Sequence, residues 1–163
     1  MRYTDIAYFG VRDSLAKRIG YDKIYVVGKD IEIVSRACPT SLPQIVIGND
    51  PGTLIGALKS PDVIGVIFES DELSKNVVEK ASELKKTVFV PVGGFTKTVV
   101  EERGRRAGRL RKIMNSAHAL GARMRIVTMA DSESSLLSVN QLREVGRLIF
   151  ENGDVDGTIG EVL

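Results

Sequence analysis

Short apolar runs rich in β-branched residues alternate with segments of helical periodicity along most of the chain. A continuous apolar run such as Val63–Phe68 is typical of a strand that is buried on both faces. Apolar strands separated by helices predict parallel strands joined by crossover helices. We expect strands at Tyr3–Phe9, Lys23–Val27, Ile31–Val34, Leu42–Ile47, Val63–Phe68, Val88–Val92 and Met124–Met129.

The segments between these strands carry helix signals. Val11–Ile19 is followed by Gly20, a residue type suited to the left-handed position after a helix. Ser138 and Gln141 resemble a capping box at the start of the last helix, which should extend to Phe150. Further helices are expected at Thr53–Leu58, from Ser70-Asp71-Glu72 to Leu84, and from the arginine-rich segment to Gly121; in the last helix Leu142, Val145, Leu148 and Ile149 should face inward.

The element order predicts a single α/β domain over residues 1–163, with a Gly- and Asp-rich tail that frays from about residue 152. An open sheet and a barrel both fit this order. A full eight-fold barrel typically needs about 250 residues, so a barrel here would be reduced, with fewer or shorter helices.

Positive charge is concentrated between Arg103 and Arg125. Only Glu101 and Glu102 oppose eight basic residues, whereas the whole chain carries a net charge of +2. A net acidic body with one basic block favours a polyanionic partner, although a solvated helix face is the simpler alternative. The basic residues are Arg103, Arg105, Arg106, Arg109, Arg111, Lys112, Arg123 and Arg125.

The basic block has helical periodicity. Leu110, Ile113, Met114, Ala117 and Leu120 recur at intervals of three and four, which predicts a buried face. Arg105, Arg109, Lys112 and Ser116 recur in the same way on another face, a spacing suited to successive phosphates of a nucleic-acid backbone. We expect Arg123 and Arg125 to join the same patch. An acidic protein could also bind this face, and charge alone does not separate the two partners.

The residues needed for catalysis by familiar side-chain constellations are scarce. His118 is the single histidine and Cys38 the single cysteine, which argues against a metal centre or a catalytic triad and fits a reducing cytoplasm. Gly48–Gly52 and Gly93–Lys97 follow strands, but each is a plain turn more often than a phosphate cradle. The sequence contains no run of about 20 apolar residues, so we do not expect a membrane-spanning helix. We therefore expect a cytoplasmic protein with no cofactor and no membrane partner.

Several segments together resemble one known family. They are Tyr3-Thr4-Asp5-Ile6, Ile19-Gly20-Tyr21 before the next strand, Ile31 to Arg36, Arg105-Arg106 in a helix ending near Gly121, Arg125 to Ala130, and Leu142 to Gly146. In this order and spacing they resemble ribonuclease P protein component 3, the archaeal relative of the thirty-kilodalton subunit of eukaryotic RNase P and RNase MRP. The sequence departs from the family at Met129, where relatives carry a small polar residue, and in its short or missing C-terminal helices.

The resemblance implies a reduced TIM-like (β/α) barrel related to polymerase-and-histidinol-phosphatase domains, without their metal site. It implies a non-catalytic subunit, since the RNA of RNase P cleaves the 5′ leader of precursor tRNA with magnesium bound to the RNA. The expected partners are the RNase P RNA with precursor tRNA, RNase P protein component 2 and other RNase P proteins. The expected RNA-binding residues are Arg36, Arg103, Arg105, Arg106, Arg109, Arg111, Lys112, Arg123 and Arg125.

Two other functions remain open on the sequence. One is a small TIM-like enzyme that binds a phosphorylated small molecule at the carboxyl ends of the strands, near Gly48 or Gly93. The other is an interaction scaffold whose basic helix meets an acidic partner.

Overall fold

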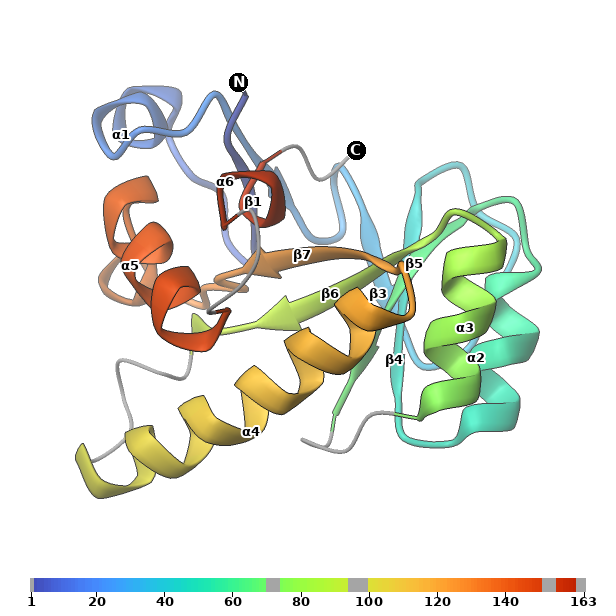
Figure 1. Cartoon of the computed structure of the whole chain (residues 1–163). Helices are drawn as coiled ribbons and strands as arrows, with labels where there is room; N and C mark the ends of the chain where they lie inside the picture. Colours follow the sequence, from blue (N-terminus) through green and yellow to red (C-terminus); the bar gives the residue numbers. More distant parts are fainter. Residues whose placement is uncertain (1, 70–73, 94–99, 151–154, 161–163) are drawn as a thin grey trace.

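All the strand pairs in this computed structural model are parallel (Figure 1). The structure describes residues 2–69, 74–93, 100–150 and 155–160. Five strands form one sheet in the order β3-β4-β5-β6-β7, and β1 pairs with β2. The strands are β1 (Thr4–Ala7), β2 (Lys23–Val26), β3 (Glu32–Val34), β4 (Gln44–Gly48), β5 (Val63–Phe68), β6 (Thr87–Pro91) and β7 (Arg123–Val127).

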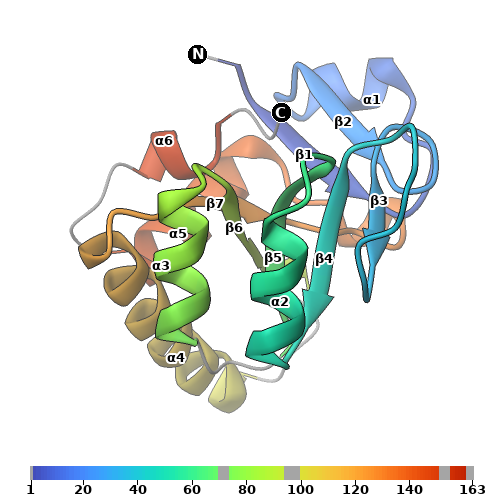
Figure 2. The same cartoon turned by 90° about the vertical axis from the view of Figure 1, so that its right-hand side faces the viewer.

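Helices occupy most of the connections between these strands. α2 and α3 lie side by side on the outside of the sheet, and α4 runs along β6 and β7 (Figures 1 and 2). The α/β class with parallel strands, predicted from the sequence, is therefore confirmed. The helices are α1 (Asp13–Arg18), α2 (Pro51–Leu58), α3 (Lys75–Glu83), α4 (Val100–Ala119), α5 (Val139–Ile149) and α6 (Val155–Thr158), with a 3-10 turn at Glu133–Ser135.

Local capping sets several helix boundaries. α2 begins at Pro51 rather than at Thr53 because the Asp50 carboxylate accepts a hydrogen bond from the Thr53 amide, at 2.7 Å. Ser138 and Gln141 form the predicted capping box of α5. The described part of α3 begins at Lys75, and the predicted helix start at residues 70–72 lies outside the described residues.

Apolar side chains pack on both faces of the strands. The outer cluster joins the strands to the helices, with Val46, Val66 and Met114 among its buried members. The inner cluster takes one side chain from each of the seven strands or, at β3, from the residue just before it: Ile6, Tyr25, Ile31, Ile45, Ile67, Phe89 and Val127. Burial on both faces explains why these strands read as continuous apolar runs.

Gly65 makes room for one member of the inner cluster. A Cβ at this position would lie 2.7 Å from Cε2 of Phe89 and 2.1 Å from the carbonyl oxygen of Thr87. Any side chain here would collide with the neighbouring strand. The glycine inside an otherwise apolar strand therefore has a packing reason.

Isolated bridges connect the β1–β2 pair to the larger sheet at both of its edges. Ala7 pairs with Ala130 just after β7, and Val27 pairs with Ile31 just before β3. β7 ends at Val127, two residues earlier than predicted, because Met129 adopts a positive φ of 50°. The chain thus leaves the strand before Ala130 meets Ala7.

The C-terminal region differs from the sequence prediction in two ways. Leu148 was expected to face inward with Leu142 and Ile149, but its side chain is 46% exposed. Fraying from residue 152 is wrong for residues 155–160, because α6 forms there and Ile159 is only 1% exposed. The Thr4 hydroxyl donates a hydrogen bond to the Gly160 carbonyl, which ties this region to β1. Residues 151–154 and 161–163 lie outside the described residues.

Candidate nucleic-acid interface

The basic residues are carried by α4, the longest helix described. Its 20 residues span roughly 30 Å, and its amino-terminal part extends beyond the carboxyl ends of β6 and β7 (Figure 1). Leu110, Ile113, Met114 and Ala117 are buried against the sheet, as their periodicity predicted. Gly121, at a φ of 67°, follows the helix.

The opposite face of α4 is exposed and cationic. Arg105, Arg109, Lys112 and Ser116 are all exposed, and their backbones rise by about 6 Å for each four-residue step. Glu102, one turn before Arg105, is the last acidic residue of the helix. Within the described part of the chain, Arg105 and Lys112 make no hydrogen bond or ion pair, so their charges are accessible to a ligand. Arg105, Arg109 and Lys112 are hereafter called the α4 basic face.

The other arginines of α4 lie at the border of this face. Arg103, Arg106 and Arg111 are half-buried. An Nη2 group of Arg111 donates a hydrogen bond to the Leu148 carbonyl oxygen at 2.9 Å, near the end of α5. Arg111 therefore joins two helices, a role that its position in the sequence did not reveal.

The remaining candidate cations lie elsewhere. Arg123 and Arg125 lie on β7, opposite Thr87 and Phe89 in the strand register. Arg103 is about 24 Å along the α4 axis from the end of the helix that leads to β7. Arg123 and Arg125 thus follow the carboxyl-terminal end of α4, the opposite end of the helix from Arg103. Arg36 is exposed just after β3, at the far edge of the five-stranded sheet from β7.

His118 lies on α4 but packs against an aromatic ring. Its imidazole contacts Phe150 edge to face, with ring centroids 5.4 Å apart. In the residues that the structure describes, no three His, Cys, Asp or Glu side chains are close enough to hold a metal ion together. None of the described helices combines the length and the apolarity needed to cross a bilayer.

The two glycine-rich turns have structural explanations in their described parts. The Asp50 carboxylate accepts hydrogen bonds from the Thr53 hydroxyl and amide, which lower its pKa and place a negative charge at the start of α2. That charge disfavours a phosphate at the same helix end. A Cβ on Gly93 would lie 2.0 Å from the Thr128 carbonyl oxygen, so close strand packing requires the glycine. Residues 94–97 lie outside the described part.

A buried carboxylate joins β1 to the end of β7. Asp5 is 0% exposed, and its Oδ1 accepts hydrogen bonds from the amides of Ile6 and Thr128, both at 2.8 Å. Its Oδ2 accepts a hydrogen bond from the Thr128 hydroxyl. Burial raises the pKa of Asp5 to about 7, although hydrogen bonds from Thr128, Ile6 and Tyr21 act in the opposite direction. Sequence reasoning gave Asp5 no such role; a lone acid within an apolar strand was the available signal.

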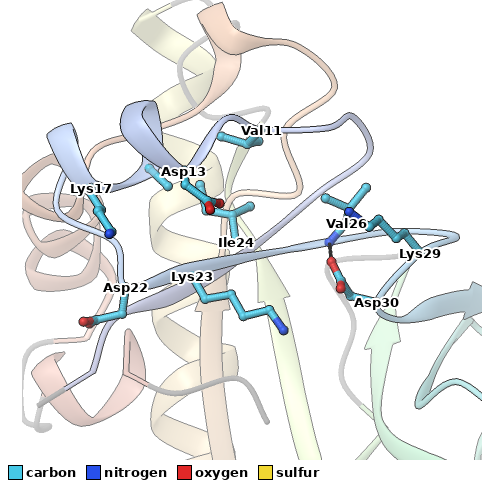
Figure 3. A pocket seen from close by; sticks show the side chains of 10 residues that line it. Val11, Asp13, Lys17, Asp22, Lys23, Ile24, Val26, Lys29 and Asp30 are labelled. Atoms are coloured by element: carbon cyan, nitrogen blue, oxygen red, sulfur yellow. Dashed lines mark hydrogen bonds between the residues drawn. The ribbon is translucent and has the colours of Figure 1, made fainter.

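Sequence reasoning also missed a groove between α1 and β2 (Figure 3). Its volume is about 430 Å³, within the usual range of ligand pockets. It forms from segments whose charges look unremarkable in the sequence. The groove is lined by Val11, Asp13, Ala16, Lys17, Asp22, Lys23, Ile24, Val26, Lys29 and Asp30.

Comparison with known proteins defines the class of this protein at the level of the fold. No family model matches the chain, and no curated protein matches it significantly. A solved structure described as that of an uncharacterized protein is similar, with a TM-score of 0.50 and 8% identity over 72% of this chain. The match spans only 31% of that protein's chain. At this identity the likeness concerns the α/β fold alone.

Proposed function

We propose that this chain is a non-catalytic, RNA-binding subunit of ribonuclease P, similar to the archaeal component 3, which stabilises the catalytic RNA for 5′ maturation of precursor tRNA. The observation that carries the proposal is the α4 basic face. Three exposed cations lie on one side of a helix that extends past the sheet, and no acidic residue follows them in that helix. The choice of this particular family rests on the sequence segments that resemble it in their order and spacing.

The same proposal includes a reduced TIM-like barrel. The bridges at both edges of the β1–β2 pair support closure, because they connect it to β7 on one side and to β3 on the other. The inner cluster supports it too, since side chains from seven strands pack together on one side of the strands. Layers of inward side chains are the usual filling of such barrels.

In this proposal the α4 basic face neutralises phosphate groups of the RNA backbone. Arginine presents a planar fork of donors that matches phosphate oxygens, and lysine adds a point charge. Contacts of this kind release condensed counterions, so affinity falls as salt rises. In this proposal catalysis remains with the RNA and its magnesium, and the partners are the RNA with precursor tRNA, RNase P protein component 2 and the other RNase P proteins, in the cytoplasm.

The proposal is tested by reconstitution. Precursor-tRNA cleavage is measured with an archaeal RNase P RNA and component 2 at limiting magnesium, with and without this chain. We expect cleavage to depend on the chain and to be lost with Arg105→Glu/Arg109→Glu, because reversing both charges places repulsion where phosphates would bind.

The matched control is Lys59→Glu/Lys85→Glu, which changes the net charge equally at exposed positions outside the α4 basic face and outside the groove between α1 and β2. It should support cleavage as the unmodified chain does. If the chain leaves cleavage unchanged while the RNA and component 2 are active, it is not a subunit of this enzyme. If the control variant fails in the same way as the α4 variant, general charge rather than the α4 basic face is responsible.

A further inference from the structure

The exposed side of α4 continues beyond the α4 basic face as an uncharged polar surface. Asn115 and Ser116 are both exposed. Ser116 follows Lys112 by four residues and Asn115 follows it by three, so both side chains are its neighbours on the helix surface. Among the described residues, neither side chain has a hydrogen-bond partner. The helix therefore presents cations along about 10 Å of its axis and neutral donors and acceptors over the next turn.

α4 offers no free ring on which an unpaired base could stack. Residues 100–119 contain no Phe, Tyr or Trp, and the single aromatic ring among them is the imidazole of His118. This imidazole already contacts Phe150 edge to face. Proteins that bind single-stranded nucleic acids combine a cationic groove with aromatic side chains under successive bases. α4 supplies the charge on a convex surface and lacks the rings, which disfavours a single strand.

The shape of this surface suits the groove of a duplex. Gly104 and Gly108 are exposed on it, and among the described residues a Cβ at either position would lie in open space. The helix is therefore narrow beside Arg105 and Arg109. Double-stranded RNA has a wide, shallow minor groove that displays 2′-hydroxyl groups, whereas its major groove is too deep and narrow for side chains to read. A narrow helix whose amino-terminal part extends past the sheet can lie along such a minor groove (Figure 1).

We propose, on the basis of the RNA-binding function given above, that α4 binds double-stranded RNA from its minor groove. Arg105, Arg109 and Lys112 neutralise phosphates at the border of the groove. Asn115 and Ser116 form hydrogen bonds with 2′-hydroxyl groups, which both donate and accept. Phosphate and 2′-hydroxyl contacts carry no base sequence, so α4 recognises the form of the duplex.

Three labelled probes test this specificity. They are an RNA duplex of about 20 base pairs, long enough to present more than one minor groove, the DNA duplex of the same sequence, and one RNA strand that cannot pair with itself. Each is titrated with the whole chain at one fixed salt concentration and followed by fluorescence anisotropy. We expect the RNA duplex to bind roughly five- to tenfold more tightly than the DNA duplex, and the single strand to bind most weakly. The two duplexes carry equal numbers of phosphates, so their comparison isolates the 2′-hydroxyl groups and the groove shape.

A double variant separates the 2′-hydroxyl contacts from charge. Asn115→Ala/Ser116→Ala should lower the affinity for the RNA duplex roughly five- to tenfold, to that of the DNA duplex, and leave the DNA duplex unaffected. Arg105→Glu/Arg109→Glu should weaken the binding of both duplexes.

The matched control is Ser14→Ala/Asn76→Ala. It removes the same two kinds of side chain at exposed positions on α1 and α3, and should bind all three probes as the unmodified chain does. Circular dichroism checks that the variants fold.

The proposal is overturned if the DNA duplex or the single strand binds as tightly as the RNA duplex. Equal weakening of both duplexes by Asn115→Ala/Ser116→Ala also overturns it, because these side chains would then not distinguish RNA from DNA. In each of these cases the proposed function still stands if precursor-tRNA cleavage depends on the chain. If neither RNA probe binds and cleavage is independent of the chain, the proposed function fails as well.

Discussion

The α4 basic face and the buried carboxyl group of Asp5 differ in their exposure to solvent. The first places three cations in solvent on one side of a helix, where ionisation costs little and a ligand can reach them. The second places one carboxyl group in the core, where the amides of Ile6 and Thr128 and the Thr128 hydroxyl surround it. Exposed charge of this kind is available for recognition, whereas the buried group holds β1 against β7.

The pH dependence of stability should show the largest difference between the two regions. The pKa of Asp5 is about 7 in the folded chain and about 3.9 when unfolded. Its contribution is fully present below the unfolded pKa and is lost as pH rises through the folded pKa, since the unfolded state loses the proton first. The loss amounts to roughly 4 kcal/mol. The check is the free energy of unfolding from urea titrations between pH 4 and pH 8.

Asp5→Asn isolates this effect from other titrating groups. The unfolding free energy of the unmodified chain, minus that of Asp5→Asn, should fall between pH 4 and pH 7. A difference that stays constant over this range would show that Asp5 does not titrate as its burial predicts. Arg105→Glu/Arg109→Glu should leave the pH profile of the unmodified chain almost unchanged.

Removal of the buried carboxyl group should have the next largest effect. Asp5→Ala leaves two buried amides and the Thr128 hydroxyl without their acceptor, which should cost about 3 kcal/mol at pH 5. Thermal or urea unfolding at that pH measures it. The control Asp13→Ala, on the exposed side of α1, should change little; equal losses in both would contradict a special role for Asp5.

A comparison of Arg111 with Arg105 separates an arginine that stabilises the fold from one that is exposed for binding. Its hydrogen bond to the Leu148 carbonyl should make Arg111→Ala destabilising by roughly 1 to 2 kcal/mol. Arg105→Ala on the exposed face should change unfolding by less than about 0.5 kcal/mol. Urea unfolding of the two single variants makes the comparison. If Arg105→Ala were more destabilising than Arg111→Ala, the stabilising role assigned to Arg111 would be contradicted.

The order of strands and helices could be predicted from the sequence because the signals for strands and for helix ends are local. Continuous apolar runs marked strands buried on both faces, and Gly20, Gly121 and the Ser138–Gln141 box marked helix ends. α6 was missed because Gly and Asp around it suggested a free tail, whereas Ile159 is buried against the rest of the fold. Leu148 was misplaced because it lies six residues after Leu142, where the helix has turned to a different face, and its side chain is 46% exposed.

Tertiary structure decides the parts of the site that the sequence could not predict. Periodicity gave the correct exposed face of α4, but not the strand register that places Arg123 and Arg125 opposite Thr87 and Phe89 of β6. The role of Asp5 depends on Thr128, which lies 123 residues away along the chain. The groove similarly requires α1 and β2 to be packed together before its lysines share a rim.

The salt dependence of RNA affinity tests the central claim most directly. Affinity for an archaeal RNase P RNA is measured between about 50 and 200 mM salt for the unmodified chain, Arg105→Glu/Arg109→Glu and Lys59→Glu/Lys85→Glu. We predict weaker binding for the first variant, with the slope of log affinity against log salt reduced by about 2, and no change for the second. An unchanged slope for Arg105→Glu/Arg109→Glu would show that the α4 basic face does not contact the RNA backbone.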